Sequence, residues 1–160
     1  MKVFTPHAIA VCLLTSFAIA PGPAWAGECK KIHADLVEYS TTEGCNPGLS
    51  SCFLGMVDGN HGLTGTTHFR GDSSVPESPA TSPNFIIYSG PFEYRTEHGT
   101  LTMRETGATT RGPNGVVTAY QEIVGATGRF AGASGHFFVS GTKEGGMVTT
   151  FVNGEVCYPE

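Results

Sequence analysis

Charged residues are scarce in this 160-residue chain, at 14% of the sequence, and basic residues are the scarcer kind. Nine Lys and Arg residues stand against 14 Asp and Glu, which gives a formal charge of -5. Apart from the pair Lys30 and Lys31, the basic residues are scattered singly. A surface that binds nucleic acid needs clustered Lys and Arg to neutralise phosphates. The sequence therefore predicts no nucleic-acid partner.

A long hydrophobic run is also missing. The longest apolar stretch, Ala8–Ala20, is shorter than the ~20 residues that a membrane-spanning helix needs. Pro21–Pro23 follow it, and a small residue, Ala26, ends the segment. This order is typical of a secretory signal peptide. We expect residues 1–26 to be removed and 27–160 to form one extracellular or periplasmic domain without a membrane span.

No helical periodicity of useful length is present, because 22 glycines and ten prolines divide the chain into short alternating segments. The predicted strands are Lys31–Tyr39, Cys52–Asp58, Leu63–Arg70, Phe85–Arg95, Thr100–Thr106, Val116–Val124, His136–Thr142 and Met147–Cys157. The Ser- and Pro-rich stretch Gly71–Pro83 is expected to be a mobile loop that does not pair as a strand. Eight strands joined mostly by hairpins predict an all-β domain, a single eight-stranded antiparallel barrel whose closure leaves no exposed edge.

In such a barrel the strands alternate in direction, so the loops sort into two ends. One end collects Thr41–Ser51, Gly71–Pro83, Gly107–Gly115 and Glu144–Gly146. The other collects Gly59–Gly62, Thr96–Gly99, Gly125–Gly135 and both chain termini. The longer loops fall mainly at the first end, which we expect to be the mouth of the barrel.

Four cysteines remain after removal of Cys12 with the leader, an even number that predicts two disulfides in an oxidising compartment. In a barrel with an even number of strands, the first strand begins beside the end of the last. Cys29 and Cys157 occupy those places, and Cys45 and Cys52 close the first loop at the other end. No Cys-x-x-Cys or His pair at ligand spacing accompanies them, so no metal site is predicted.

A glycine cluster, Val124–Gly135, resembles a dinucleotide-binding turn, and Thr127-Gly128 with Gly132 matches a reductase-like pattern. Such a loop must open a helix, whereas His136 and the residues after it continue as a strand. We therefore predict no cofactor. The cluster is interpreted as a structural turn formed by Gly125, Gly128, Phe130, Gly132 and Gly135.

The segment Ile123–Gly135 resembles the Gly-Gly-Thr-Gly-x-Phe turn of dirigent proteins and allene oxide cyclase-like barrels, in particular bacterial-type secreted members without an assigned role. The resemblance implies a calycin-like or allene oxide cyclase-like eight-stranded barrel with a central cavity. Ala126 replaces the second glycine, and Ser134 stands where dirigent proteins often carry an arginine. No catalytic residue is carried over from the resemblance.

Serine-hydrolase, P-loop and His-Glu-x-x-His motifs are absent, so carboxylates on strands are the remaining chemical candidates. Residues two apart share a strand face, which places Glu105 in line with Leu101 and Met103. An inward-facing carboxylate with a raised pKa could act as an acid or base, and the alternative is an ordinary charge on the outer face. The candidates are Glu105 and Glu122 for catalysis and Tyr120, His68, Arg70 and Met103 for ligand contacts.

Three functions remain open. The protein could bind a small, largely apolar molecule, it could be an isomerase or cyclase acting on a small hydrophobic substrate, or it could be a structural or interaction module with a filled barrel. Binding is favoured because small strand residues (Gly55, Gly65, Ala119 and Gly141) would leave interior space if they face inward. A homo-oligomer is left open.

The predicted leader contains Trp25, the only tryptophan in the chain. We expect the first residue of the secreted protein to be Gly27, and the purified material to show no tryptophan fluorescence. N-terminal sequencing and an emission spectrum test both points. Tryptophan emission from secreted material would contradict the predicted cleavage.

Overall fold

A computed structural model describes residues 27–48, 51–75 and 84–159 of the chain. The predicted signal peptide lies outside the described residues. The described elements are strands β1 (Cys29–Ser40), β2 (Cys52–Gly59), β3 (Gly65–Arg70), β4 (Ser73–Val75), β5 (Phe85–Thr96), β6 (Gly99–Thr110), β7 (Gly115–Ala126), β8 (Ser134–Glu144) and β9 (Met147–Cys157), with a short 3₁₀ turn η1 (Gly128–Phe130) between β7 and β8.

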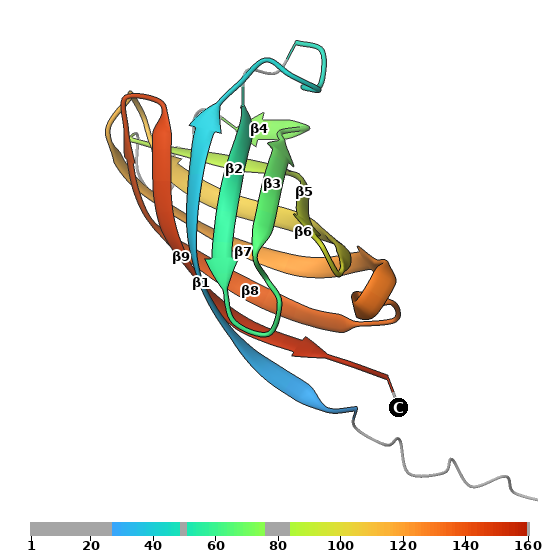
Figure 1. Cartoon of the computed structure of the whole chain (residues 1–160). Helices are drawn as coiled ribbons and strands as arrows, with labels where there is room; N and C mark the ends of the chain where they lie inside the picture. Colours follow the sequence, from blue (N-terminus) through green and yellow to red (C-terminus); the bar gives the residue numbers. More distant parts are fainter. Residues whose placement is uncertain (1–26, 49–50, 76–83, 160) are drawn as a thin grey trace, which may run out of the picture.

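Eight of these strands form a closed antiparallel barrel. Each strand pairs with the next along the chain, except that β3 pairs directly with β5 and β4 lies outside this ring. The first and last strands complete the ring, with a continuous register from Cys29↔Cys157 to Tyr39↔Met147. Figure 1 shows β1 and β9 side by side, with the C-terminus at the lower end. The predicted eight-stranded antiparallel barrel is confirmed.

The prediction that Gly71–Pro83 does not pair was wrong for β4. Ser73, Ser74 and Val75 pair with the first part of β5, just beyond the point where β3 leaves it. The Asp72 amide donates to the Ser89 carbonyl at 2.9 Å, and the Arg104 guanidinium binds the Asp72 carboxylate. These contacts hold β4 against β5. The pairing arises because β5 extends beyond the end of β3, where its backbone groups would otherwise lack hydrogen-bond partners. Residues 76–83 of this predicted loop lie outside the described residues.

Side chains alternate between the barrel interior and its outer face, as the two-residue period of a strand requires. In β1 the buried residues are Ile32, Ala34, Leu36 and Glu38. The interior side chains with almost no exposure are mainly aromatic and aliphatic: Tyr94, Phe92, Phe137, Ile32, Leu36, Leu63, Leu101, Met103, Val152 and Val156. Phe130 of η1 joins this cluster with 2% exposure. The turn before it depends on Gly128, whose φ of +60° and close approach to the His98 carbonyl leave no room for a Cβ.

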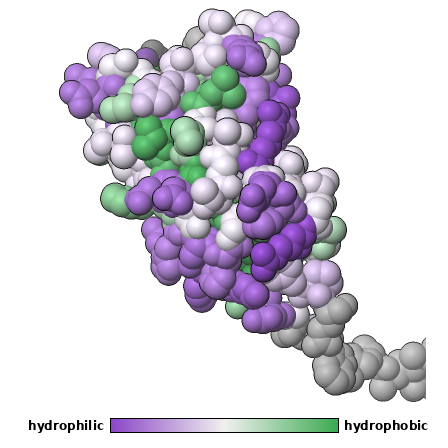
Figure 2. Space-filling view, viewed as in Figure 1, coloured by the Kyte–Doolittle hydropathy of each residue, from purple (hydrophilic) through white to green (hydrophobic). Residues whose placement is uncertain are grey.

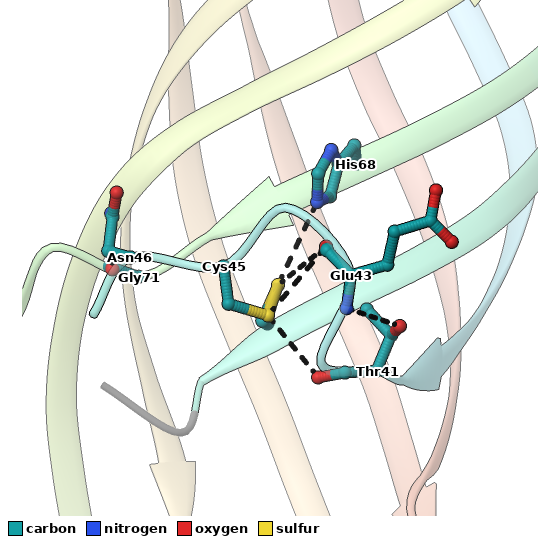
Figure 3. The surroundings of a disulfide bond; sticks show 7 residues. Thr41, Glu43, Cys45, Asn46, His68 and Gly71 are labelled. Atoms are coloured by element: carbon teal, nitrogen blue, oxygen red, sulfur yellow. Dashed lines mark hydrogen bonds between the residues drawn. A yellow bond between two sulfur atoms is a disulfide. The ribbon is translucent and has the colours of Figure 1, made fainter. Parts of the chain in front are cut away.

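Both predicted disulfides are confirmed. Cys29–Cys157 joins the paired ends of β1 and β9, and Cys45–Cys52 closes the loop between β1 and β2. The wide loop that Cys29–Cys157 closes is expected to contribute about 4–5 kcal/mol through the lost entropy of the unfolded chain. Figure 3 shows the Cys45–Cys52 disulfide and its loop beside His68 on β3.

The outer surface mixes polar and apolar side chains. In the view of Figure 2, apolar residues gather in the upper half of the molecule, and hydrophilic residues cover much of the lower half. On the outer face of β7 and β8, the Tyr120 ring contacts His136 and Phe138, with centroids 5.8 and 5.4 Å apart. Among the described residues, no helix has the length and apolar character needed to cross a membrane.

Candidate functional site

The interior is open at the mouth, the end of the barrel that carries the β1–β2, β3–β5, β6–β7 and β8–β9 connections. A cavity of about 230 Å³ lies there, above the filled lower part of the barrel. Its lining side chains come from every barrel strand: Glu38, Ser51 (just before β2), Phe53, Phe69, Tyr88, Glu105, Thr109, Val117, Lys143 and Val148. The end at which the sequence predicted the mouth is the end at which the cavity lies.

Three aromatic rings form one wall of the cavity. The Phe69 ring lies 6.5 Å from Phe53 and 5.5 Å from Tyr88, between centroids, and meets Tyr88 edge to face. Val117 and Val148 add aliphatic surface. The lining is therefore mainly apolar, as in most small-molecule sites, with a few polar groups that can orient a ligand.

Two carboxyl groups, Glu38 and Glu105, are the most buried charged residues of this lining, with 7% and 5% exposure. Each continues an inward-facing apolar row, since Glu38 follows Leu36 on β1 and Glu105 follows Met103 on β6. The closed barrel brings these two strands into one interior although they are not hydrogen-bonded neighbours. Two acids from different walls therefore face the same cavity.

A chain of hydrogen bonds orients Glu105. The Tyr94 hydroxyl donates to Gln121 Oε1 at 2.7 Å, and Gln121 Nε2 then donates to Glu105 Oε2. Gln121 is fully buried and pairs with Glu105 in the β6–β7 register. Because Tyr94 occupies the amide oxygen, the amide nitrogen is left to face the carboxyl group. Glu105 is thus held with one oxygen as a hydrogen-bond acceptor.

Glu38 lies in a tighter and less satisfied environment. It is in register with Gly55 on β2, and Gly55 is in register with Thr67 on β3. A Cβ on Gly55 would lie 2.6 Å from Glu38 Cγ and 2.7 Å from Thr67 Oγ1, so only glycine lets these two side chains meet. Glu38 Oε1, Thr67 Oγ1 and Thr150 Oγ1 are buried without a hydrogen-bond partner among the described residues.

Burial makes both carboxyls weaker acids. Desolvation, together with the nearby charge of Glu105, raises the pKa of Glu38 from 4.5 to about 8, although the Thr67 hydroxyl beside it acts in the opposite direction. Desolvation raises the pKa of Glu105 to about 7, although its contacts with Gln121 and Tyr88 act in the opposite direction. Burial also raises the pKa of Tyr88 and Tyr94, so both phenols stay protonated. Because the charge of Glu105 disfavours ionisation of Glu38, the two carboxyls do not titrate independently.

Lys143 supplies the positive charge of the lining. It lies near the end of β8, at the rim of the cavity, and its ammonium donates to the Thr110 carbonyl. Partial burial lowers the pKa of this ammonium. Neither Glu38 nor Glu105 takes part in an ion pair among the described residues.

The structure separates the candidate residues of β6 and β7. Glu105 lines the cavity, and Met103 is completely buried in the core beneath it. Tyr120 and Glu122 lie on the outer face of the barrel, where Tyr120 is 41% exposed. Glu122 therefore cannot act on a molecule inside the cavity, and it does not form a pair with Glu105.

His68 and Arg70 also lie on the outer face. The loop that Cys45–Cys52 closes covers His68, with Cys52 Sγ 3.7 Å from His68 Nε2 (Figure 3). Burial, and then the charges of Arg70 and Arg95, lower the pKa of His68. Arg70 forms an ion pair with Glu93 at 2.6 Å. These two residues stabilise the outside of β3 and do not contact the cavity.

The sequence reasoning missed Glu38, Lys143 and the aromatic wall. Glu38 carried the same signal that identified Glu105, because Ile32, Ala34, Leu36 and Glu38 form an apolar row that ends in an acid. The small strand residues Gly55, Gly65, Ala119 and Gly141 do not line the cavity, and Glu38 and Thr67 occupy the space beside Gly55. Gly55 and Ala119 face the interior. Gly141 shares the face of buried Val139 on β8.

Comparisons with known proteins leave the chain without an assigned family. No protein-family model, curated protein or solved structure matches it. Within the described part of the chain, no three His, Cys, Asp or Glu side chains cluster in a way that could hold a metal ion. The geometry of the mouth cavity is therefore the basis for the functional proposals.

The buried carboxyls predict an unusual pH dependence of stability. Between pH 4.5 and their raised pKa values of about 7 and 8, the folded chain binds more protons than the unfolded chain. We therefore expect the free energy of unfolding to fall as the pH rises through this window, by at most about 1.4 kcal/mol per pH unit for each group. Urea denaturation at several pH values from about 5 to about 8.5, a range that includes both raised pKa values, measures this decline. Glu38→Gln should flatten the decline, whereas Glu122→Gln on the outer face should keep it, and equal slopes in all three proteins would contradict the assignment.

Proposed function

We propose that this chain is a secreted barrel protein that binds one small molecule, with a largely apolar body, in the cavity at its mouth. The observation that carries the proposal is the cavity itself. An eight-stranded barrel can be filled by its own side chains or can hold one small ligand. Here the lower half is filled, whereas about 230 Å³ at the mouth stays open. A filled barrel with a purely structural role fits this interior less well.

The size and lining of the cavity indicate the kind of ligand. An apolar cavity of about 150 Å³ in another protein holds a benzene molecule. The larger volume here suits an aromatic ring with a short substituent, placed against Phe53, Phe69 and Tyr88. The polar atoms of Glu38 and Glu105 would contact the substituent.

We further propose that the protein is secreted and that it belongs to the family its Ile123–Gly135 turn resembles. The layout of residues 1–26 favours a signal peptide, and two disulfides are typical of proteins that fold in an oxidising compartment. The turn at Ile123–Gly135 favours membership of the allene oxide cyclase-like and dirigent-like barrels. A homo-oligomer is compatible with the apolar side chains on the outer face, such as Phe138, Phe151 and Val124, which are more than half exposed.

Filling the cavity tests ligand binding. The probe is indole, whose own fluorescence is readily measured if the mature protein lacks tryptophan. We expect wild-type protein to bind indole, and Val117→Phe to weaken binding by at least about tenfold, because the larger side chain occupies the open space. Val116→Phe is the matched control, since the neighbouring side chain is on the outer face with 48% exposure. Equal affinities of wild type and Val117→Phe for indole would refute the proposal, as would a wild-type protein that binds neither indole nor other aromatic compounds of this size up to their solubility.

A second candidate function is proton transfer on a small substrate, as in an isomerase or cyclase. The observation that favours it is Glu105, a carboxyl that faces the cavity, is oriented by Gln121 and has a pKa of about 7. A general acid or base works best when its pKa lies near the operating pH.

Deuterium exchange tests this candidate with phenylacetone, a small aromatic ketone that matches the cavity in size. The wild-type protein should accelerate exchange of the α-protons in D₂O, as followed by ¹H NMR. Glu105→Gln should lose this acceleration, and Glu122→Gln should retain it. No acceleration by the wild type, or full acceleration by Glu105→Gln, would argue against an acid–base role.

A further inference from the structure

The mouth cavity contains two buried carboxyls that no cationic side chain of the described residues contacts. Glu38 and Glu105 are both buried in its lining, and neither has a cationic partner among the described residues. Lys143 is at the rim and is already bonded to the Thr110 carbonyl. Burying a carboxylate without a counter-charge is strongly unfavourable. Protonation relieves this cost near neutral pH, and above it a ligand that carries a positive charge would relieve it in the same way.

One of these two carboxyls has a buried acceptor without a donor. Glu38 Oε1 is buried and has no hydrogen-bond partner among the described residues. The Gln121 amide holds Glu105 with its Oε2 as an acceptor, so this carboxyl is already oriented to bind donors. An ammonium group brings two or three N–H donors at one point, so it can donate to more than one carboxyl oxygen.

The aromatic wall suits the rest of such a ligand. Phe53, Phe69 and Tyr88 offer ring faces and edges beside the carboxyls. A cation near an aromatic face is attracted to the ring quadrupole, and an apolar body buries surface against the same rings. A cavity of about 230 Å³ has room for a six-membered ring and a short arm.

We propose that the ligand is a small protonated amine with an aromatic or aliphatic body, whose ammonium group binds between the Glu38 and Glu105 carboxyls. This inference rests on the proposed binding function and names the chemical class of the ligand. An apolar molecule without a donor would leave the Glu38 acceptor buried and unpaired. An anionic ligand would add a third acidic group to the two already present.

The charge of the site also makes binding depend on pH. The titratable groups that face the interior near Glu38 are Glu105 on β6, Tyr88 and Tyr94 on β5 and Lys143 on β8. The residues that β2, β3, β7 and β9 turn toward this interior, such as Phe53, Thr67, Gln121 and Thr150, do not titrate. Raising the pH from 6 to 8, about the range over which the carboxyls lose their protons, should therefore strengthen amine binding. A simple alkylamine keeps its charge over this range, as lysine does.

Three compounds of similar shape that differ in charge test the proposal. Isothermal titration calorimetry with the disulfide-intact protein compares 2-phenylethylamine with its neutral isostere, 2-phenylethanol, and with the anion phenylacetate. We expect the amine to bind at least about tenfold more tightly than the alcohol at pH 8, and phenylacetate to bind most weakly. The affinity for the amine should rise from pH 6 to pH 8, and the affinity for the alcohol should not.

Variants locate the effect at the carboxyls. Glu38→Gln and Glu105→Gln should each remove most of the preference for the amine over the alcohol, and Glu122→Gln should keep it. If either buried variant fails to fold, the pH dependence and the comparison of the three compounds with the wild type still decide the question.

The indole experiment distinguishes failure of the amine proposal from failure of the proposed binding function. If indole binds but the amine has no advantage over the alcohol, the amine proposal fails and the binding function stands. If neither indole nor any of the three compounds binds, both fail.

Discussion

Hydrogen bonding between the first and last strands is the constraint on which the rest of this structure depends. The β1–β9 ladder runs along nearly the whole of both strands and turns an eight-stranded sheet into a closed surface. Closure gives each strand an inner and an outer face. Because successive side chains point to opposite faces, every second side chain lies in the interior and the others face solvent. The Cys29–Cys157 disulfide holds the end of this seam. Without the seam, neither the core nor the cavity would be enclosed.

Enclosure changes the chemistry of the side chains that it removes from water. Glu38 and Glu105 would be ordinary carboxylates on an open sheet, but inside the barrel their pKa values rise because the charged forms lose hydration. The surrounding groups compensate for only part of this loss. Gln121 satisfies one oxygen of Glu105, whereas one oxygen of Glu38 has no described partner. Such an incompletely satisfied polar region beside an aromatic wall is more typical of a binding site than of a stable core.

Rows of alternating side chains with similar composition can face either the interior or the solvent. On β7, the row of Ala119, Gln121 and Ile123 faces inward, and the row of Tyr120 and Glu122 faces outward. Both rows mix apolar and polar residues, so alternation alone could not decide which one lines the interior. On β3, His68 is buried without being inside the barrel, because the Cys45–Cys52 loop covers it from outside. Burial and proximity to the cavity are therefore separate properties here.

Local patterns in the sequence determined the all-β class, the positions of the eight barrel strands, both disulfide pairings and the end at which the long loops gather. Each of these follows from alternation, turn residues or the parity of the strand number, which are properties of neighbouring residues or of a simple meander. The tertiary structure alone decided the pairing of β4, which depends on the spare length of β5 and on the Arg104–Asp72 contact. It also decided that Glu38 and Glu105 share one cavity while Glu122 and His68 do not. The physical reason is that the curvature and closure of the sheet place distant strands across one interior, and no local pattern encodes that distance.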